Sequence, residues 1–159
     1  MAPKNGLDIL RYKKALDFSY NLYKNKFRKG IKIPYFTYLL SVSNLVIENN
    51  GNSDEAIASL FNEAIEENSG NKNFNLIKKR FGARVANIVK QCSNSQKINL
   101  NNENWIEEKK KFLDSMQKKT QTSLFVCLCD KYHSSSCIIN DYNKIGKKLW
   151  NYYPTSSEN

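Results

Sequence analysis

Long apolar runs are missing from this sequence, and residues that break helices are scarce. No stretch approaches the about 18 consecutive apolar residues that a membrane-spanning helix needs, which excludes a transmembrane helix. The first six residues also lack the apolar stretch of a secretory signal. Six glycines and three prolines, with 40% hydrophobic residues in 159, suit a folded core. We therefore expect a single cytoplasmic domain over residues 1–159, with its core over residues 7–152.

Cysteine is also scarce, and its four positions match no metal-ligand spacing. Cys127 and Cys129 lie in the apolar segment 124–129, where a free thiol behaves as a small hydrophobic side chain. We therefore expect all four thiols to be reduced, as in a cytosolic protein. The cysteines are Cys92, Cys127, Cys129 and Cys137.

Acidic residues are outnumbered, with 15 against 25 lysines and arginines, and the net charge is +10. A field of this sign attracts polyanions such as nucleotides, nucleic acid or an acidic membrane face. A solvated surface without a partner has the same composition. Lysines clustered at 109–111, 118–119 and 147–148 also fit an interaction module for nucleic acid or an acidic protein.

Hydrophobic residues recur at helical spacing through most of the chain, which predicts an all-α bundle. Pro34 opens the second predicted helix, and Ser53 is the predicted N-cap of the third. The predicted helices cover 7–24, 34–47, 53–69, 74–81, 85–92, a segment from 105, a segment from 123, and 137–152. The residues expected in the core are Ile57, Leu60, Phe61, Ile65, Phe81, Val85, Ile88, Leu124, Val126, Leu128, Ile138, Ile145, Leu149 and Trp150.

A basic loop follows the first predicted helix, and aromatic residues flank and interrupt it. Lysine and arginine neutralise phosphates, and an arginine plane or an aromatic ring stacks on a base. A solvated lysine-rich loop would have the same composition. The basic residues are Lys24, Lys26, Arg28, Lys29 and Lys32, and the aromatic ones are Tyr20, Tyr23, Phe27, Tyr35 and Phe36.

Carboxylates gather on the third predicted helix at Glu63, Glu66 and Glu67, beside Asn62. Residues 62 and 66 share a helical face, as do residues 63 and 67. Such a cluster could hold a hard cation or share a proton. A solvent-facing helix also shows glutamates as a matter of course, so both interpretations stay open.

Seven short segments, taken in their order along the chain, resemble one known family. They read RKG at 28–30, IPYFTYLLSV at 33–42, DEAIASLFNEAIEE at 54–67, RFGARV at 80–85, WIEEK at 105–109, DKYH at 130–133 and DYNKIGKKLW at 141–150. Together they resemble the HD-type metal-dependent phosphohydrolases, specifically the RelA/SpoT-type guanosine tetraphosphate (ppGpp) hydrolases and their small stand-alone bacterial relatives. The resemblance implies a single HD-domain-like helical bundle.

The resemblance also implies a metal centre whose ligands are largely replaced here. The family holds one metal, usually manganese, with a His, a His-Asp pair and a distant Asp, and this metal polarises the phosphoryl group and activates water. Tyr38 stands at the first histidine, Asn62 and Glu63 stand at the pair, and only Asp130 is retained. We expect Glu63 and Asp130 to bind Mn²⁺ or Mg²⁺ weakly through oxygen, with no tightly bound cofactor.

Two further positions bear on the lost imidazoles. Tyr23 stands where the family has another histidine, and we expect Tyr23 and Tyr38 to fill the vacated volume, hydrogen-bonded to Glu63 or Asp130. His133, the only histidine, lies three residues after the aspartate, at a position that is not a ligand in the family. For His133 we expect a capping or hydrogen-bonding role.

The nucleotide side of the implied site is better retained. By resemblance, Arg28 and Lys29 contact the base and phosphates, and Lys131 keeps its place after the aspartate. Ser134 replaces an asparagine that helps hold the nucleotide. Glu66 and Glu67 stand where the family has its catalytic acid pair, Glu-Asp.

These observations favour a pseudoenzyme that binds an anionic nucleotide in the former active-site cleft. An active hydrolase with a rebuilt oxygen-ligand site is the first alternative, and it requires Glu63 and Asp130 to hold the metal. A basic interaction module is the second alternative. Relatives often self-associate, and the sequence leaves the oligomeric state open.

Overall fold

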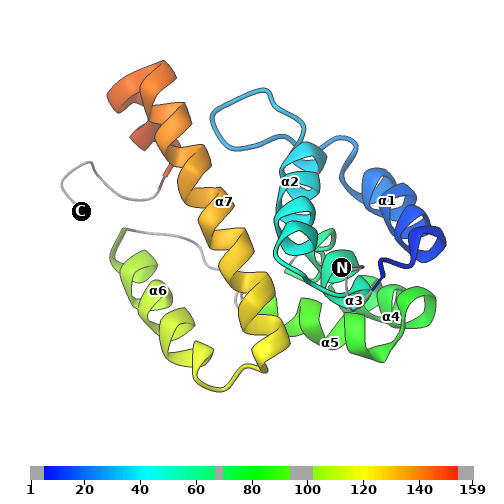
Figure 1. Cartoon of the computed structure of the whole chain (residues 1–159). Coiled ribbons are helices and arrows are strands. Elements are labelled where there is room, and N and C mark those ends of the chain that lie inside the picture. The colour runs from blue at the N-terminus through cyan, green and yellow to red at the C-terminus, as the bar shows by residue number, and fades with distance from the viewer. Residues whose placement is uncertain (1–5, 67–69, 94–101, 154–159) are drawn as a thin grey trace.

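The computed structural model describes residues 6–66, 70–93 and 102–153. Within these ranges the chain is helical and contains no strand, only an isolated bridge between Phe27 and Pro34 (Figure 1). The all-α prediction is confirmed. The helices are α1 (Ile9–Tyr23), α2 (Tyr35–Glu48), α3 (Ser53–Ser59), α4 (Gly70–Phe81), α5 (Ala83–Cys92), α6 (Asn102–Met116), α7 (Gln121–Ile145) and the 3-10 helix η1 (Gly146–Tyr152).

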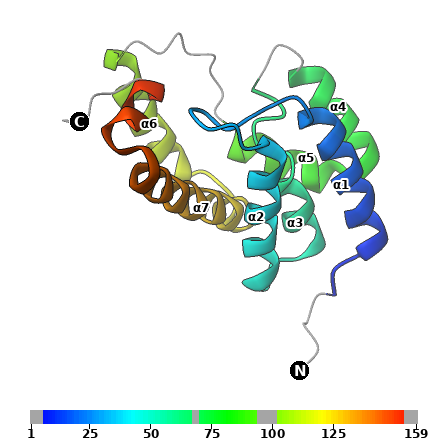
Figure 2. The same cartoon turned by 90° about the horizontal axis from the view of Figure 1, so that it is seen from above.

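The core forms around the short helix α3, which packs against α1, α2, α5 and α7 (Figure 2). Asn52 caps this helix in a capping box with Glu55, so both orphan donors of its first turn are satisfied. Phe61, fully buried just beyond the helix, lies against the rings of Phe18 and Phe81 at centroid distances of 5.6 and 5.2 Å. This packing holds the segment after α3 in place against α1 and α4.

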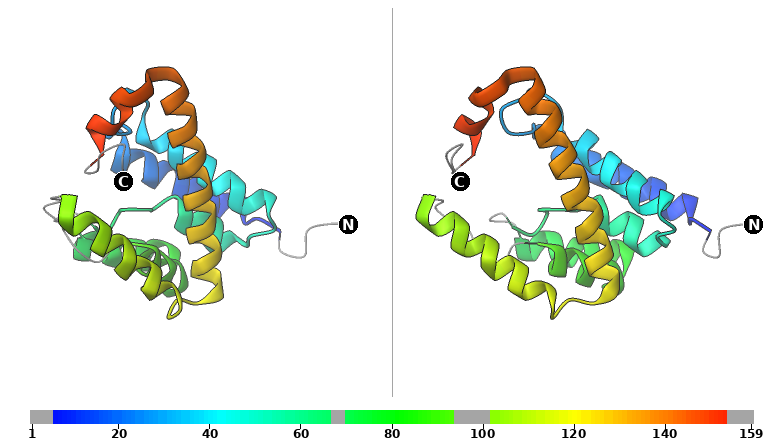
Figure 3. Two further views of the ribbon diagram at one scale, coloured as in Figure 1. Left: turned by 90° about the vertical axis from the view of Figure 1, so that its left-hand side faces the viewer. Right: turned by 60° about the vertical axis from the view of Figure 1, so that its left-hand side comes forward.

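Helix α7 crosses α2 and α3, while α6 lies to one side of the bundle (Figure 3). Thr120 caps the start of α7 by accepting a hydrogen bond from the Ser123 N–H. Asp130 and Asp141 are both buried on this helix. The crossing therefore brings polar groups of α7 against the segment that follows α3.

The third predicted helix was too long. Helix α3 ends at Ser59, and residues 60–66 form turns, with Glu63 in the left-handed region at φ 64°. A right-handed helix cannot pass through that conformation. Asn62, Glu63 and Glu66 therefore do not share helical faces, and Glu67 lies outside the described residues. The cap is Asn52 rather than Ser53.

Other helix boundaries also differ from the prediction. Helix α4 begins at Gly70, four residues before the predicted start, and α6 begins at Asn102. One helix, α7, replaces the two predicted from 123 and over 137–152, because residues 121–145 contain neither glycine nor proline to stop it. Its three successive serines at 134–136 do not break the helix.

Most of the predicted core is confirmed, with one clear error. Leu128 is 66% exposed on the outer face of α7. The four cysteines are free, and Cys127 and Cys129 are buried as expected. Within the described ranges no helix is both long and apolar enough to cross a membrane. The core predictions found buried are Ile57, Leu60, Phe61, Phe81, Val85, Ile88, Val126 and Leu149, and those found half-buried are Ile65, Leu124, Ile138, Ile145 and Trp150.

Candidate functional site

Asp130 is the centre of a polar network where α7 meets α2 and the turn after α3. The residue is only 7% exposed. Oδ1 accepts hydrogen bonds from the Tyr38 hydroxyl at 2.7 Å and from Asn62 Nδ2 at 2.8 Å, and Oδ2 accepts one from Lys131 Nζ at 2.9 Å. Because an ionised carboxylate is an acceptor only, the Asn62 amide must present its NH₂ group. The structure thus brings together three positions of the implied metal centre.

The Tyr38 hydroxyl is held as a protonated donor. Its ring stacks on Tyr35 at 5.4 Å and lies 4.9 Å from the ring of His133. Burial raises the pKa of Tyr38 well above its usual range, and the neighbouring charge of Asp130 raises it further. A Ser134 hydrogen bond acts in the opposite direction on the Tyr38 pKa. The phenol therefore stays neutral and donates to Asp130.

Glu63 turns away from this network toward the basic loop. Glu63 Oε2 lies 2.8 Å from Lys26 Nζ. The same ammonium lies over the ring of Tyr35, 4.8 Å from its centroid, and 5.8 Å from the centroid of Tyr23. Tyr23 donates to the main-chain carbonyl of Asn62 at 2.6 Å, rather than to a carboxylate as expected. Lys26 thus neutralises Glu63, one of the two acidic positions at which the resemblance implies metal ligands.

The residues present do not fit the divalent metal that the resemblance implies. Oδ1 of Asp130 already accepts two hydrogen bonds, and ammonium groups pair with Oδ2 and with Glu63. Across the described ranges no three His, Cys, Asp or Glu side chains gather closely enough to hold a metal ion. The cavity beside Asp130, Asn62 and Lys131 has a volume of about 10 Å³, which is at the lower limit for one water molecule.

The four predicted nucleotide-binding residues lie in different surroundings. Arg28 forms an ion pair with the buried carboxylate of Asp141, and this pair ties the basic loop to α7. Lys29 is exposed, and Lys131 is partly exposed beside the ring of Phe112, 5.2 Å away. Ser134 lies at Tyr38, as described above. The nucleotide roles of these residues remain predictions.

Lys109 was assigned from the sequence to a lysine run outside the pocket, but it belongs to this region. Partial burial lowers the pKa of Lys109, and the charges of Lys131 and Lys29 lower it further. Lys29 comes from the loop before α2, Lys109 from α6 and Lys131 from α7. Glu66 partly offsets these charges, and it raises the pKa of both Lys109 and Lys131.

His133 lies in the middle of α7, so it does not cap a helix. Its Nε2 lies 3.5 Å from Cys137 Sγ one turn later. Burial lowers the pKa of His133, and the Arg28 charge lowers it further. A neutral ring packed on Tyr38 supports the network from the side opposite Tyr35.

Sequence reasoning missed two partners in the site. Lys26 was identified only as one of several basic-loop residues, and Asp141 only as part of a matching segment. The only signal for the Arg28–Asp141 pair was that these two oppositely charged residues stand in two segments of one resemblance. No sequence signal indicated that Lys26 rather than its neighbours would reach Glu63, because this depends on the left-handed turn at residue 63.

Two neighbouring tyrosines allow a matched test of the network. Tyr38→Phe is expected to lower the free energy of unfolding by about 2 kcal/mol, because it removes a hydrogen bond to a buried charged group. Tyr35→Phe removes a buried hydroxyl that has no partner among the described residues, and it should leave stability unchanged or raised. Urea denaturation of both variants measures the difference. Equal losses would contradict the network.

Comparisons with known proteins identify the family and the fold. A model of the HD domain family matches residues 15–140, so the chain belongs to the HD domain family. A solved structure of a metazoan ortholog of SpoT, described as hydrolysing ppGpp and acting in starvation responses, shares the fold with a TM-score of 0.69. It is 16% identical, over 92% of this chain and 88% of that one. No curated protein matches the chain in sequence.

Proposed function

We propose that this HD domain is a pseudoenzyme that binds an anionic nucleotide, of the guanosine polyphosphate type, without a metal ion. The observation that carries the proposal is the state of Asp130, the one retained ligand. Both of its oxygens accept hydrogen bonds, from Tyr38, Asn62 and Lys131. In this family a metal-bound water makes phosphate hydrolysis fast at neutral pH. Here the three hydrogen-bond donors occupy both oxygens of the Asp130 carboxylate, so a metal would have to displace at least one of them.

The second acidic position supports the same conclusion. A metal at Glu63 would have to displace Lys26, whose ammonium is held by the carboxylate and by two aromatic rings. Such a cation–π contact adds to the ion pair where water is partly excluded. An active site rebuilt on Glu63 and Asp130 would first have to break both arrangements.

The nucleotide half of the proposal is supported by the lysines that surround the network. Lys29, Lys109 and Lys131 come from three different elements, and the charges of Lys131 and Lys29 add to partial burial in lowering the pKa of Lys109. A polyphosphate bound among them would relieve this repulsion and accept charge-assisted hydrogen bonds. Arg28 has a different role in this proposal, because its guanidinium is engaged with Asp141 and positions the loop that carries Lys29.

The test measures binding and turnover on the same protein. We expect ppGpp to bind with an affinity that EDTA does not change, and we expect no pyrophosphate release when Mn²⁺ is added. Lys131→Ala should weaken binding about tenfold, because one charge-assisted hydrogen bond is lost. Isothermal titration calorimetry and a pyrophosphate assay give the two readouts.

The control removes the same charge elsewhere. Lys78→Ala alters an exposed lysine of α4 and should leave ppGpp affinity unchanged at fixed salt. Release of pyrophosphate that disappears in Glu63→Ala would establish the active hydrolase instead. Equal weakening by Lys78→Ala and Lys131→Ala, with a steep fall in binding as salt rises, would instead indicate a general polyanion surface.

A further inference from the structure

Helix α7 presents an apolar stripe to solvent. Leu128 is 66% exposed, Tyr132 64%, Ile139 62% and Tyr142 40%. Figure 2 shows α7 along one edge of the molecule, with no other described helix on its outer side. Large apolar side chains exposed singly are ordinary, but four on one helix form a contiguous patch.

The stripe has the spacing of a helix–helix seam. With Ser135 included, its members are 4, 3, 4 and 3 residues apart, the repeat of alternating seam positions in packed helices. At 100° per residue the stripe lies opposite the face that carries Asp130 and Asp141. It is therefore separate from the polar network, and the inference does not rest on nucleotide binding.

The stripe is also nearly symmetric about Ser135. A second α7 running antiparallel across a two-fold axis at this residue sets Leu128 against Tyr142 and brings Tyr132 within one position of Ile139. An interface between identical copies requires this self-complementarity. The small serines at 134–136 lie at the crossing point, where they let two helix axes approach closely.

Few charged side chains lie on the outer face of α7, which allows this face to pack against a second copy of the same helix. The helix has four ionic residues, and Asp130 and Asp141 are buried on its inner face. Of the exposed pair, Lys144 lies on the inner side of the helix, and only Lys131 borders the stripe. In the antiparallel arrangement the two Lys131 residues are eight positions apart along the axis, about 12 Å, which exceeds the Debye length of about 8 Å at physiological salt. Depletion of charge is what distinguishes the centre of an interface.

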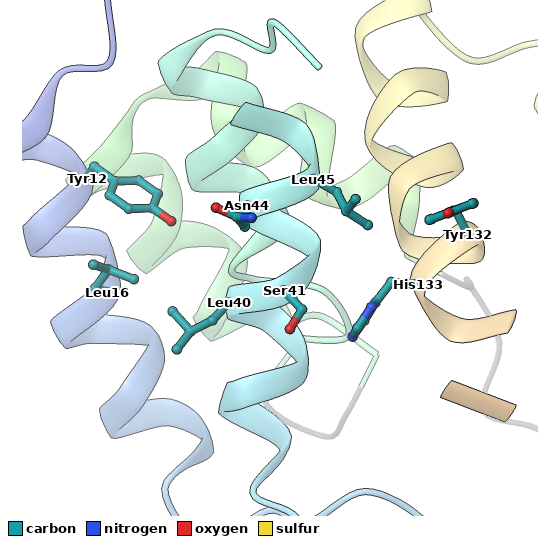
Figure 4. A pocket seen from close by; sticks show the side chains of 8 residues that line it. All are labelled: Tyr12, Leu16, Leu40, Ser41, Asn44, Leu45, Tyr132 and His133. Carbon is teal, nitrogen blue, oxygen red and sulfur yellow. The ribbon is translucent and has the colours of Figure 1, made fainter. Parts of the chain in front are cut away.

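A groove beside the stripe adds contact area. It has a volume of about 600 Å³ and is lined by α1, α2 and α7; Leu45 of α2 lies toward Tyr132, and Leu40 lies toward Leu16 of α1 (Figure 4). The four exposed side chains present roughly 450 Å² if each offers about 200 Å² when fully exposed. This is about half of the roughly 800 Å² that a standard interface buries per partner, so the dimer belongs to the small, concentration-dependent class of interfaces.

We propose that the protein forms a two-fold symmetric homodimer in which the outer faces of α7 pack antiparallel about Ser135. Because each copy carries a charge of +10, association strengthens as salt screens the repulsion between copies. This dependence is opposite to that of nucleic-acid binding.

Sedimentation equilibrium of the full chain tests the dimer. The expected mass is twice 18.4 kDa at high protein concentration. Tyr132→Glu should weaken association about tenfold or more, because it sets a charge in the seam. Leu113→Glu, at a 59% exposed residue of α6, is the matched control and should associate like the wild type. A monomer at all concentrations, or equal association of wild type and Tyr132→Glu, overturns the proposal.

A cysteine at the axis tests the register. In Ser135→Cys the two new thiols face each other, so mild oxidation should join the copies quantitatively, beyond the background of the wild type. Asn140→Cys, exposed on the same helix but off the stripe, should not crosslink. Crosslinking of Asn140→Cys alone would show that two copies meet by another face, and preferential capture of an unrelated apolar helix by the wild type would show a different occupant. Either result overturns the proposed dimer.

Discussion

Replacing Asp141 with leucine is expected to lower the free energy of unfolding by about 3 kcal/mol or more. The Asp141 side chain is 3% exposed and its partner Arg28 is 15% exposed, so the substitution leaves a guanidinium largely buried without its counter-charge. The cost arises from that unpaired charge rather than from the loss of an attraction. Urea denaturation, with the midpoint and slope fitted together, measures it.

A double variant separates these two contributions. Arg28→Met with Asp141→Leu removes both charges and keeps much of their volume, so its stability should return to within about 1 kcal/mol of the wild type. Arg28→Met alone should be destabilised, because it leaves the Asp141 carboxylate buried. If the double variant lost as much stability as the two single variants summed, packing rather than charge would be the cause.

Restoring the ancestral type of ligand set is the second large expected effect. The triple substitution Tyr38→His, Asn62→His and Glu63→Asp returns the pattern implied by the family resemblance, with Asp130 already present. Outer-shell partners alone change metal affinity by about 10–100-fold, so restoring three direct ligands should tighten Mn²⁺ binding at least about 100-fold. Aspartate also suits residue 63, because it tolerates the left-handed conformation and is one methylene too short to keep the Lys26 pair.

Calorimetric titration with Mn²⁺ tests the rebuilt site without relying on turnover. The wild type should show no binding in the micromolar range, and the triple variant should. Adding Asp130→Ala to the triple variant is the matched control and should abolish the gain. Micromolar Mn²⁺ binding by the wild type would refute the assignment of this pocket as metal-free, whatever the behaviour of the triple variant.

The fold was predictable because its signals are local and redundant. Apolar residues at helical spacing identified the core segments around Phe61 and Val126, but the predicted core omitted buried residues of α2 such as Leu39 and Val42. The order of short segments added the family, since seven weak matches in sequence are jointly specific. The error at Leu128 has a physical cause: spacing shows that a residue lies on an apolar face of a helix, and α7 has two such faces.

The sequence predicted which residues gather in the site, but it did not predict all of the pairs that they form. Tyr38, Asn62 and Asp130 were expected together and lie in one hydrogen-bonded network. The partner of Glu63 was not predicted, because helical periodicity continued through residue 63 while the backbone there is left-handed. The left-handed backbone at Glu63 accompanies the pairing of its carboxylate with Lys26, and sequence patterns do not encode single dihedral angles.

The ammonium of Lys26 differs from a dissolved cation because it is covalently attached to the same chain as the Glu63 carboxylate that it neutralises. A tethered group meets its partner at an effective concentration that reaches millimolar even for flexible connections, and the bridge between Phe27 and Pro34 constrains this loop further. A dissolved cation would have to compete for Glu63 with an ammonium group at this effective concentration. Lys26 therefore acts as a built-in counter-ion for Glu63, and we expect the shape of the domain to be the same with and without added manganese.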